Sequence, residues 1–218
     1  MSGSRIGLFG GSFDPIHRGH VEPVLEAARA LALDRVLYLP TARPPHKQGP
    51  RYASALSRLA MVELALLDHD HLLVDPLELG EKVHYTIDTV RTLQEREPGV
   101  YFLFLGADSL LEFDQWRAWR DIAAACELVV LRRPGFPLEP DRWPEALREG
   151  LDPTRVHIID NHLWQASSTT LRGVLGAGRT SADSVARDAR TAWANDDVAS
   201  EMLHPRVLQY VEKYGLYG

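Results

Sequence analysis

The sequence predicts an α/β fold in which a doubly wound, mostly parallel sheet carries helices on both faces. Two observations support this fold class. Short apolar runs alternate with helical patterns along most of the chain, as expected for strands joined by helical crossovers. The first apolar run, residues 6–9, also enters a glycine turn directly before a helical pattern. Because such sheets bind ligands beyond the carboxyl ends of their strands, that turn is the first candidate site.

The expected elements follow from the spacing of apolar residues. After residue 20, apolar side chains recur with the spacing of one helical face through residue 32. Residues 132–144, with four prolines and a glycine, form the most linker-like stretch. Strands are expected at residues 6–9, 35–40, 71–79, 100–106, 128–131 and 156–159. Helices are expected at residues 17–32, 54–67, 86–97, 116–125 and 167–175, with a helical segment at the C-terminal end.

Composition restricts the class of protein. A chain of 218 residues with 45% hydrophobic residues can bury a substantial core, and one domain over residues 1–218 is the simplest expectation. A net charge of −6 provides no broad basic field, which argues against nucleic acid and favours a small partner. There is no charged leader and no apolar run of membrane length. With a single cysteine, Cys126, this predicts a soluble cytoplasmic protein whose thiol is buried and inert.

The turn after the first strand predicts a phosphate site. Gly10 and Gly11 lack a Cβ, so backbone N–H groups of the turn can approach a ligand closely. His17 and His20 fall in the first helical turn, where unpaired N–H groups and the helix dipole favour anions. Each residue alone would more simply be a turn or capping residue, but their coincidence favours a phosphate site. The expected residues of this site are Gly10, Gly11, Ser12, Phe13, His17 and His20.

Residues 10–20 resemble the HxGH signature of the nucleotidyltransferase superfamily, and more closely that of bacterial nicotinate-nucleotide adenylyltransferases. The resemblance implies a Rossmann-like fold and an enzyme of NAD biosynthesis. Such an enzyme joins nicotinate mononucleotide to the AMP part of ATP, giving nicotinate adenine dinucleotide and pyrophosphate. The resemblance reaches the closing residues 210–217 but is interrupted at about residues 180–200, a stretch rich in Ala, Asp and Arg to which we assign no role.

A second motif follows the last expected strand and opens a helix. Residues 167–172 resemble the ISSTxxR motif of this family, in which hydroxyls, the helix N-terminus and the arginine hold the triphosphate. The simpler interpretation is a plain helix cap with a solvated arginine. Ala166 stands where the family has isoleucine, and residues 161–165 depart from its common pattern. The expected ATP-binding residues here are Ser167, Ser168, Thr169 and Arg172.

A third motif lies in the loop of residues 40–51, where Arg43, His46, Lys47 and Arg51 cluster among prolines. Residues 44–47 resemble the PPHK loop of the family, which implies a cationic flap that closes over phosphates. The alternative is a solvated basic loop.

Two further segments concern the second substrate. Tyr85 and Thr86 open a helix whose N–H groups could receive a carboxylate, and Trp116 could stack on a pyridine ring. Trp116 could equally be a core or interface aromatic beside Trp119. The segments YTID and GADSL resemble those of the family, which implies that Trp116 stacks on the nicotinate and that the Tyr85–Thr86 amides bind its carboxylate. Asp108 is then expected near the bound nucleotides.

The implied reaction needs little from the protein in the way of a base. The phosphate of a mononucleotide is already an anionic nucleophile, so positioning and charge neutralisation are expected to carry catalysis. The expected catalytic residues are His17, His20, Lys47 and Arg172. No cluster of ligands has the spacing of an all-protein metal cage, so Mg²⁺ is expected to arrive with ATP. The partners are then ATP and nicotinate mononucleotide, and association with a second copy of the chain is left open.

Other functions remain to be distinguished. One is an adenylyltransferase for nicotinamide mononucleotide or pantetheine phosphate. Cytidylyltransferases keep HxGH but give no reason for the combination of Tyr85, Thr86 and Trp116. A non-catalytic ATP or dinucleotide sensor would be expected to lose a histidine or Arg172, and neither is lost. A class I aminoacyl-tRNA synthetase fragment shares the HxGH logic, yet this chain lacks a KMSKS-like loop.

Overall fold

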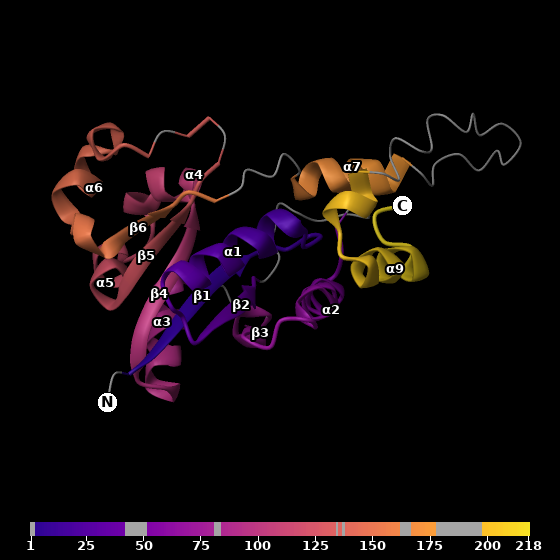
Figure 1. The fold of residues 1–218 in the computed structure, drawn as a ribbon, viewed down its shortest axis with the longest axis horizontal. Coiled ribbons are helices and arrows are strands. Elements are labelled where there is room, and N and C mark those ends of the chain that lie inside the picture. Colours follow the sequence, from indigo (N-terminus) through magenta and orange to yellow (C-terminus); the bar gives the residue numbers. More distant parts are fainter. Residues whose placement is uncertain are drawn as a thin grey trace, which may run out of the picture.

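Six parallel strands form one sheet in the order β3-β2-β1-β4-β5-β6. The structure is a computed structural model that describes residues 3–41, 52–80, 84–133, 135–136, 138–161, 167–177 and 198–218. Figure 1 shows α1 lying across the sheet, with α7 and α9 beside each other at one end. The chain adds β2 and β3 on one side of β1 and then crosses to the other side, where β4, β5 and β6 follow. Strands β1 and β4 therefore lie side by side at the centre of the sheet. This is the doubly wound α/β fold that the sequence predicts.

The strands of this sheet are β1 Ser4–Gly11, β2 Arg35–Pro40, β3 Leu72–Val74, β4 Gly99–Gly106, β5 Cys126–Leu131 and β6 Val156–Ile159. The helices are α1 Arg18–Ala30, α2 Ala55–Leu66, α3 Thr86–Arg96, α4 Ala107–Leu111, α5 Trp119–Ala125, α6 Glu145–Gly150, α7 Ser168–Ala177 and α9 Pro205–Tyr214. Residues 198–202 are also helical. None of the helices in these described ranges has the length and apolar character needed to cross a membrane.

Each inner strand buries side chains on both faces of the sheet. In β1, Ile6 and Leu8 pack on one face, whereas Phe9 packs on the other. The first face is covered by α3, α4, α5 and α6, and the second by α1, α2, α7 and α9. Burial on both sides explains why these strands consist of nearly continuous apolar residues.

Two expected elements are wrong in part. The strand expected at residues 71–79 ends at Val74, because Pro76 has no N–H to donate and opens a short 3₁₀ helix. The Asp75 carboxylate caps that turn by accepting the Leu77 N–H at 2.9 Å. The helix expected from residue 116 begins only at Trp119, because Ala118 is in the left-handed region with φ 54°.

The chain also forms helices that the sequence reading missed. Helix α4 starts directly where β4 ends, in residues for which the sequence predicted no element. The stretch read as linker-like instead packs against the core: Leu138 and Trp143 are buried, and the Trp143 indole N–H donates to the Leu138 carbonyl at 3.1 Å. The expected helical C-terminal segment is confirmed by α9.

Cys126 begins β5 and is 1% exposed. Burial raises the pKa of its thiol to about 12, so almost no reactive thiolate forms near neutral pH. We expect the native protein to resist a thiol-specific disulfide reagent at pH 8 and to react at the rate at which it unfolds. The unfolded protein in denaturant, which should react within seconds, is the control, and rapid stoichiometric labelling of the native protein would contradict the buried position.

Candidate active site

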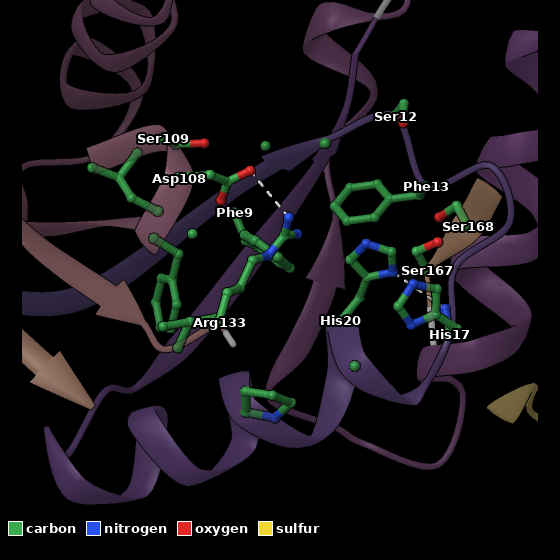
Figure 2. A pocket seen from close by; sticks show the side chains of 18 of the residues that line it. Phe9, Ser12, Phe13, His17, His20, Asp108, Ser109, Arg133, Ser167 and Ser168 are labelled. Carbon is green, nitrogen blue, oxygen red and sulfur yellow. Dashed lines mark hydrogen bonds and ion pairs between the residues drawn. The ribbon is translucent and has the colours of Figure 1, made fainter. Parts of the chain in front are cut away.

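A cleft of about 750 Å³ opens beyond the carboxyl ends of β1, β4 and β5. This volume is typical of a small-molecule site, and its position is the one where open parallel sheets bind ligands. Figure 2 shows the side chains of α1 and of the turn after β1 facing this cleft. Its lining includes the predicted site residues Gly10, Gly11, Ser12, Phe13, His17, His20, Asp108, Trp116, Ser167, Ser168, Thr169 and Arg172.

The turn after β1 forms the floor of the cleft. Gly10 and Gly11, expected in the turn, are the last residues of β1 and lead into it. A Cβ placed on Gly10 would meet no atom within 4 Å, so the backbone at the end of the strand is open to a ligand. Phe13 is buried and takes the left-handed φ of 46°, which is costly for a residue with a side chain. Its ring stands edge-on against His20, with centroids 5.3 Å apart. Tertiary packing therefore holds the turn and the second histidine in one arrangement.

His17 and His20 lie together at the start of α1, where His17 is the capping residue. Their ring centroids are 3.8 Å apart, and Figure 2 shows the two rings side by side. The backbone N–H of His17 donates to Nδ1 of His20 at 3.3 Å, which leaves the Nε2 atom of His20 to carry the ring proton. Within the described residues, Nδ1 of His17 is buried without a hydrogen-bond partner. A phosphate oxygen would satisfy it in the tautomer that carries the proton on Nδ1, and a water molecule would satisfy it in either tautomer.

Both imidazoles are neutral near pH 7. Burial, and then the nearby Arg133 guanidinium, lower the pKa of His17 to about 4. Burial also lowers the pKa of His20 well below its usual range, with His17 and Arg133 adding to the effect. The pair therefore offers N–H donors to a ligand, not two fixed positive charges.

Helix α7 is attached to the glycine turn by its first residues. Ser167 caps the helix, accepting the Thr170 N–H at 3.1 Å, and the Ser168 hydroxyl donates to the Pro15 carbonyl at 3.0 Å. One turn later, Arg172 donates through Nη1 to the Asp14 carbonyl at 2.6 Å. Residues more than 150 positions apart thus form one wall of the cleft.

Arg172 makes two more contacts. Its Nη2 donates to the Thr169 hydroxyl at 3.1 Å, and its guanidinium lies 4.9 Å from the centre of the Tyr52 ring. These contacts fix the plane of the guanidinium, and no other described residue is shown to occupy its remaining N–H groups, which could donate to a phosphate.

Arg58 supports the turn from below and was missed by sequence reasoning. It is 1% exposed and donates to the Ser12 carbonyl at 2.6 Å and the Thr41 carbonyl at 2.8 Å. It therefore joins the turn after β1 to the residue that precedes segment 42–51. The signal was present in the sequence: Arg58 shares the apolar face of α2 with Met61 and Val62, where a cation has to have polar partners.

The opposite wall carries an ion pair that sequence reasoning found only in part. Arg133 Nη1 lies 3.1 Å from Asp108 Oδ2, and the dashed line in Figure 2 marks this contact. The other oxygen, Oδ1, is buried and has no hydrogen-bond partner among the described residues. A Cβ on Gly106 would lie 2.4 Å from that oxygen, so a larger residue at the end of β4 would force the carboxylate to shift.

Arg132, Arg133 and Asn161 also line the cleft and were missed. Asn161 accepts the Arg132 N–H at 2.8 Å, which joins the ends of β5 and β6. Their position directly after predicted strands could have identified them as site residues, because the carboxyl ends of parallel strands lie together.

The residues expected at the second substrate are only partly brought together. Trp116 lines the cleft and packs against Phe113, with ring centroids 5.4 Å apart. Tyr85 and Thr86 do not line it; Tyr85 is half-exposed beside α3, and the Arg117 guanidinium lies 4.4 Å from its ring centre. No side chain in the described part of the chain caps the start of α3, so its first N–H groups stay available.

Some predicted residues lie outside the described ranges. These are Lys47 with Arg43, His46 and Arg51, Ala166 with its neighbours 162–165, and most of the interruption at residues 180–200.

Solved structures share this fold. The nicotinic acid mononucleotide adenylyltransferase of Plasmodium falciparum complexed with APC matches 98% of this chain and 97% of its own, with a TM-score of 0.71 and 18% identity. The same protein complexed with NaAD matches with a TM-score of 0.70.

Sequence comparisons identify the family. Residues 8–174 match the model of the cytidylyltransferase-like family. The probable nicotinate-nucleotide adenylyltransferase of Pseudomonas aeruginosa is 40% identical over 194 residues, which cover 82% of this chain and 89% of that protein. The protein of the same description from Solibacter usitatus is 40% identical over 98% of this chain and 100% of its own. The chain therefore belongs to the nicotinate-nucleotide adenylyltransferases, within the cytidylyltransferase-like family.

Proposed function

We propose that this protein transfers the AMP part of ATP to nicotinate mononucleotide and does so in the cleft at the end of β1. One observation carries the proposal: paired histidine donors, a glycine floor and an arginine on a helix start all face one cleft. Anionic phosphates need this set of donors, and no protein nucleophile has to be added to it.

The reaction balances without a covalent enzyme intermediate. An oxygen of the mononucleotide 5′-phosphate attacks the α-phosphorus of ATP and forms the new P–O bond. The bond from that phosphorus to the oxygen bridging the α- and β-phosphates breaks, and pyrophosphate leaves with the electron pair. Repulsion between two anions dominates the barrier, so donors that hold them in line supply most of the catalysis.

The residues around the cleft support specific roles. Nε2 of His20 and the ring of His17 would donate to the triphosphate, and Arg172 would neutralise its outer oxygens. The backbone of the glycine turn would bind beneath, with the start of α7 at the far end. We assign Lys47 to the same triphosphate as part of the flap implied by the PPHK resemblance.

Mg²⁺ fits this cleft as a group carried on ATP. Among the described residues no three His, Cys, Asp or Glu side chains gather as metal ligands, but Asp108 Oδ1 is buried and unpartnered. One carboxylate combined with phosphate oxygens and water is a usual environment for this ion. When bound, Mg²⁺ would neutralise part of the triphosphate charge.

The acceptor side of the proposal rests on Trp116 and on the start of α3. Trp116 presents an aromatic surface in the cleft, suited to a pyridine ring. The uncapped N–H groups near Thr86 suit a carboxylate, provided the acceptor reaches past Trp116 toward α3.

Purified protein with ATP and Mg²⁺ should release pyrophosphate with nicotinate mononucleotide as acceptor. We expect kcat/KM for this acceptor to exceed that for nicotinamide mononucleotide by about tenfold or more, because a carboxamide would set its NH₂ against N–H donors. Pantetheine phosphate, and CTP in place of ATP, test the other transferase functions. Equal use of the two mononucleotides would refute the proposed carboxylate site. Absence of transfer to every acceptor would refute the proposed adenylyltransferase activity.

Replacing one histidine of the pair tests the phosphate site. His20→Ala should lower kcat by about a hundredfold, the usual loss when a preorganised donor to developing charge is removed. His69→Ala, on a histidine that does not line the cleft, is the matched control. Normal turnover in a His20→Ala protein with an unchanged melting temperature would contradict the assignment.

The lowered histidine pKa values predict a specific pH dependence. Because each folded-state pKa lies below 6.5, the unfolded chain binds more protons than the folded one as the pH falls from 6.5 to about 4. The neutral pair thus stabilises the fold above this window and loses that contribution within it. NMR of the imidazole Cε1–H signals, assigned with His17→Asn, should show both rings neutral at pH 6.

Bound ATP should raise both pKa values, because its negative charge favours imidazolium. A midpoint above pH 6 in the free protein, or no upward shift with saturating ATP, would contradict this electrostatic description.

A further inference from the structure

A single carboxylate oxygen joins the phosphate turn to the C-terminal end of the chain. Asp14 is 4% exposed, and its Oδ1 accepts the Tyr217 hydroxyl at 2.7 Å and the Ala53 N–H at 3.1 Å. Tyr217 is equally buried, although it is 203 positions away in sequence. This oxygen thus gathers three distant parts of the chain.

The same residue anchors the arginine of the cleft. The backbone carbonyl of Asp14 accepts Nη1 of Arg172 at 2.6 Å. A shift of Asp14 would therefore move the anchor of Arg172, and the two bonds form a direct path from Tyr217 to the guanidinium.

A second contact ties Tyr217 to the helix that carries Arg172. A Cβ on Gly176 of α7 would lie 2.7 Å from the Tyr217 carbonyl oxygen, closer than real Cβ atoms come. Helix and C-terminal segment thus touch backbone to backbone. A Cβ on Gly173, one turn earlier, would meet nothing within 4 Å.

The C-terminal segment is held in a specific shape to make these contacts. Gly215 ends α9 in the left-handed region with φ 64°, and Tyr217 itself has φ 70°. Tertiary contacts must stabilise this conformation, because it is unfavourable for tyrosine. Burial and the neighbouring Asp14 raise the pKa of Tyr217, so its hydroxyl keeps the proton that it donates.

We propose that Tyr217 is a positioning residue for the use of ATP: acting through Asp14, it holds the carbonyl that sets the place of Arg172. The inference rests on the proposed role of Arg172 at the triphosphate. Tyr217 lies behind the cleft wall and does not line the cleft, so its effect on the substrates is indirect.

Tyr217→Phe removes the hydroxyl and keeps the ring. We expect kcat/KM for ATP to fall by about tenfold, mostly through a higher KM, because a misplaced cation binds phosphate less well in both ground and transition states. The KM for nicotinate mononucleotide should change by less than about twofold, because Trp116 and α3 are untouched. Tyr214→Phe, the same change on an exposed ring of α9, is the matched control and should leave the kinetics unchanged.

A double-mutant cycle separates positioning from general weakening of the fold. In an Arg172→Ala background, Tyr217→Phe should lower kcat/KM for ATP by less than about twofold, because the residue it positions is gone. A full tenfold loss in that background would overturn the inference. If Arg172→Ala alone leaves ATP kinetics normal, the proposed role of Arg172 fails; if it impairs them while Tyr217→Phe does not, only this inference fails.

A pair of glycine variants gives the same test without touching the hydroxyl, and decides the question should Tyr217→Phe fail to fold. Gly176→Ala adds a methyl group that pushes the C-terminal segment away from α7. Gly173→Ala adds the same methyl group to the same helix, where it meets no other atom. We expect Gly176→Ala to raise the KM for ATP by about fivefold or more and Gly173→Ala to leave it unchanged. Equal KM values for ATP in the two variants would overturn the inference.

Discussion

Parallel pairing of all six strands is the constraint on which the cleft depends. In β1, Gly11 pairs with Pro40 of β2, and in β4, Gly106 pairs with Leu131 of β5. The chain therefore leaves every one of these strands at the same edge, where the glycine turn, α4 and Arg132–Arg133 meet. Thr41 continues this edge by donating its N–H to the Gly11 carbonyl at 2.9 Å. An antiparallel neighbour would have sent one of these segments to the far end of the sheet.

The fold was largely predictable because its strands are buried on both faces, which makes them read as short continuous apolar runs. Strands 35–40 and 156–159 have the expected bounds. The pattern of apolar residues did not show two local exceptions. Ala118 takes a left-handed conformation, which delays the start of α5. Pro76 opens a 3₁₀ helix where the strand was expected to continue, in keeping with the preference of proline for helix starts. These outcomes depend on tertiary packing and on hydrogen bonds to particular neighbours.

Which residues line the candidate site was predictable where residues close in sequence form one motif. The paired histidines and the first residues of α7 therefore lie in the cleft as expected. Arg58, Arg133 and Asn161 each bond a residue 25 or more positions away. Their places on α2 and after strands were visible in the sequence, but the partners were not. Tyr85 and Thr86 are close in sequence but do not line the cleft. A helix start without a side-chain cap does not by itself show which cleft it faces.

The contact between Asp14 and Tyr217 also affects the order in which parts of the protein can form during its synthesis. A ribosome adds Tyr217 203 positions after Asp14, and only after every strand of the sheet. The sheet and most of its core can assemble from contacts already available during synthesis, whereas closure of this long loop must wait. The wall that carries Arg172 is therefore completed after the sheet, and a nascent chain can hold a formed sheet well before the proposed site for ATP is finished.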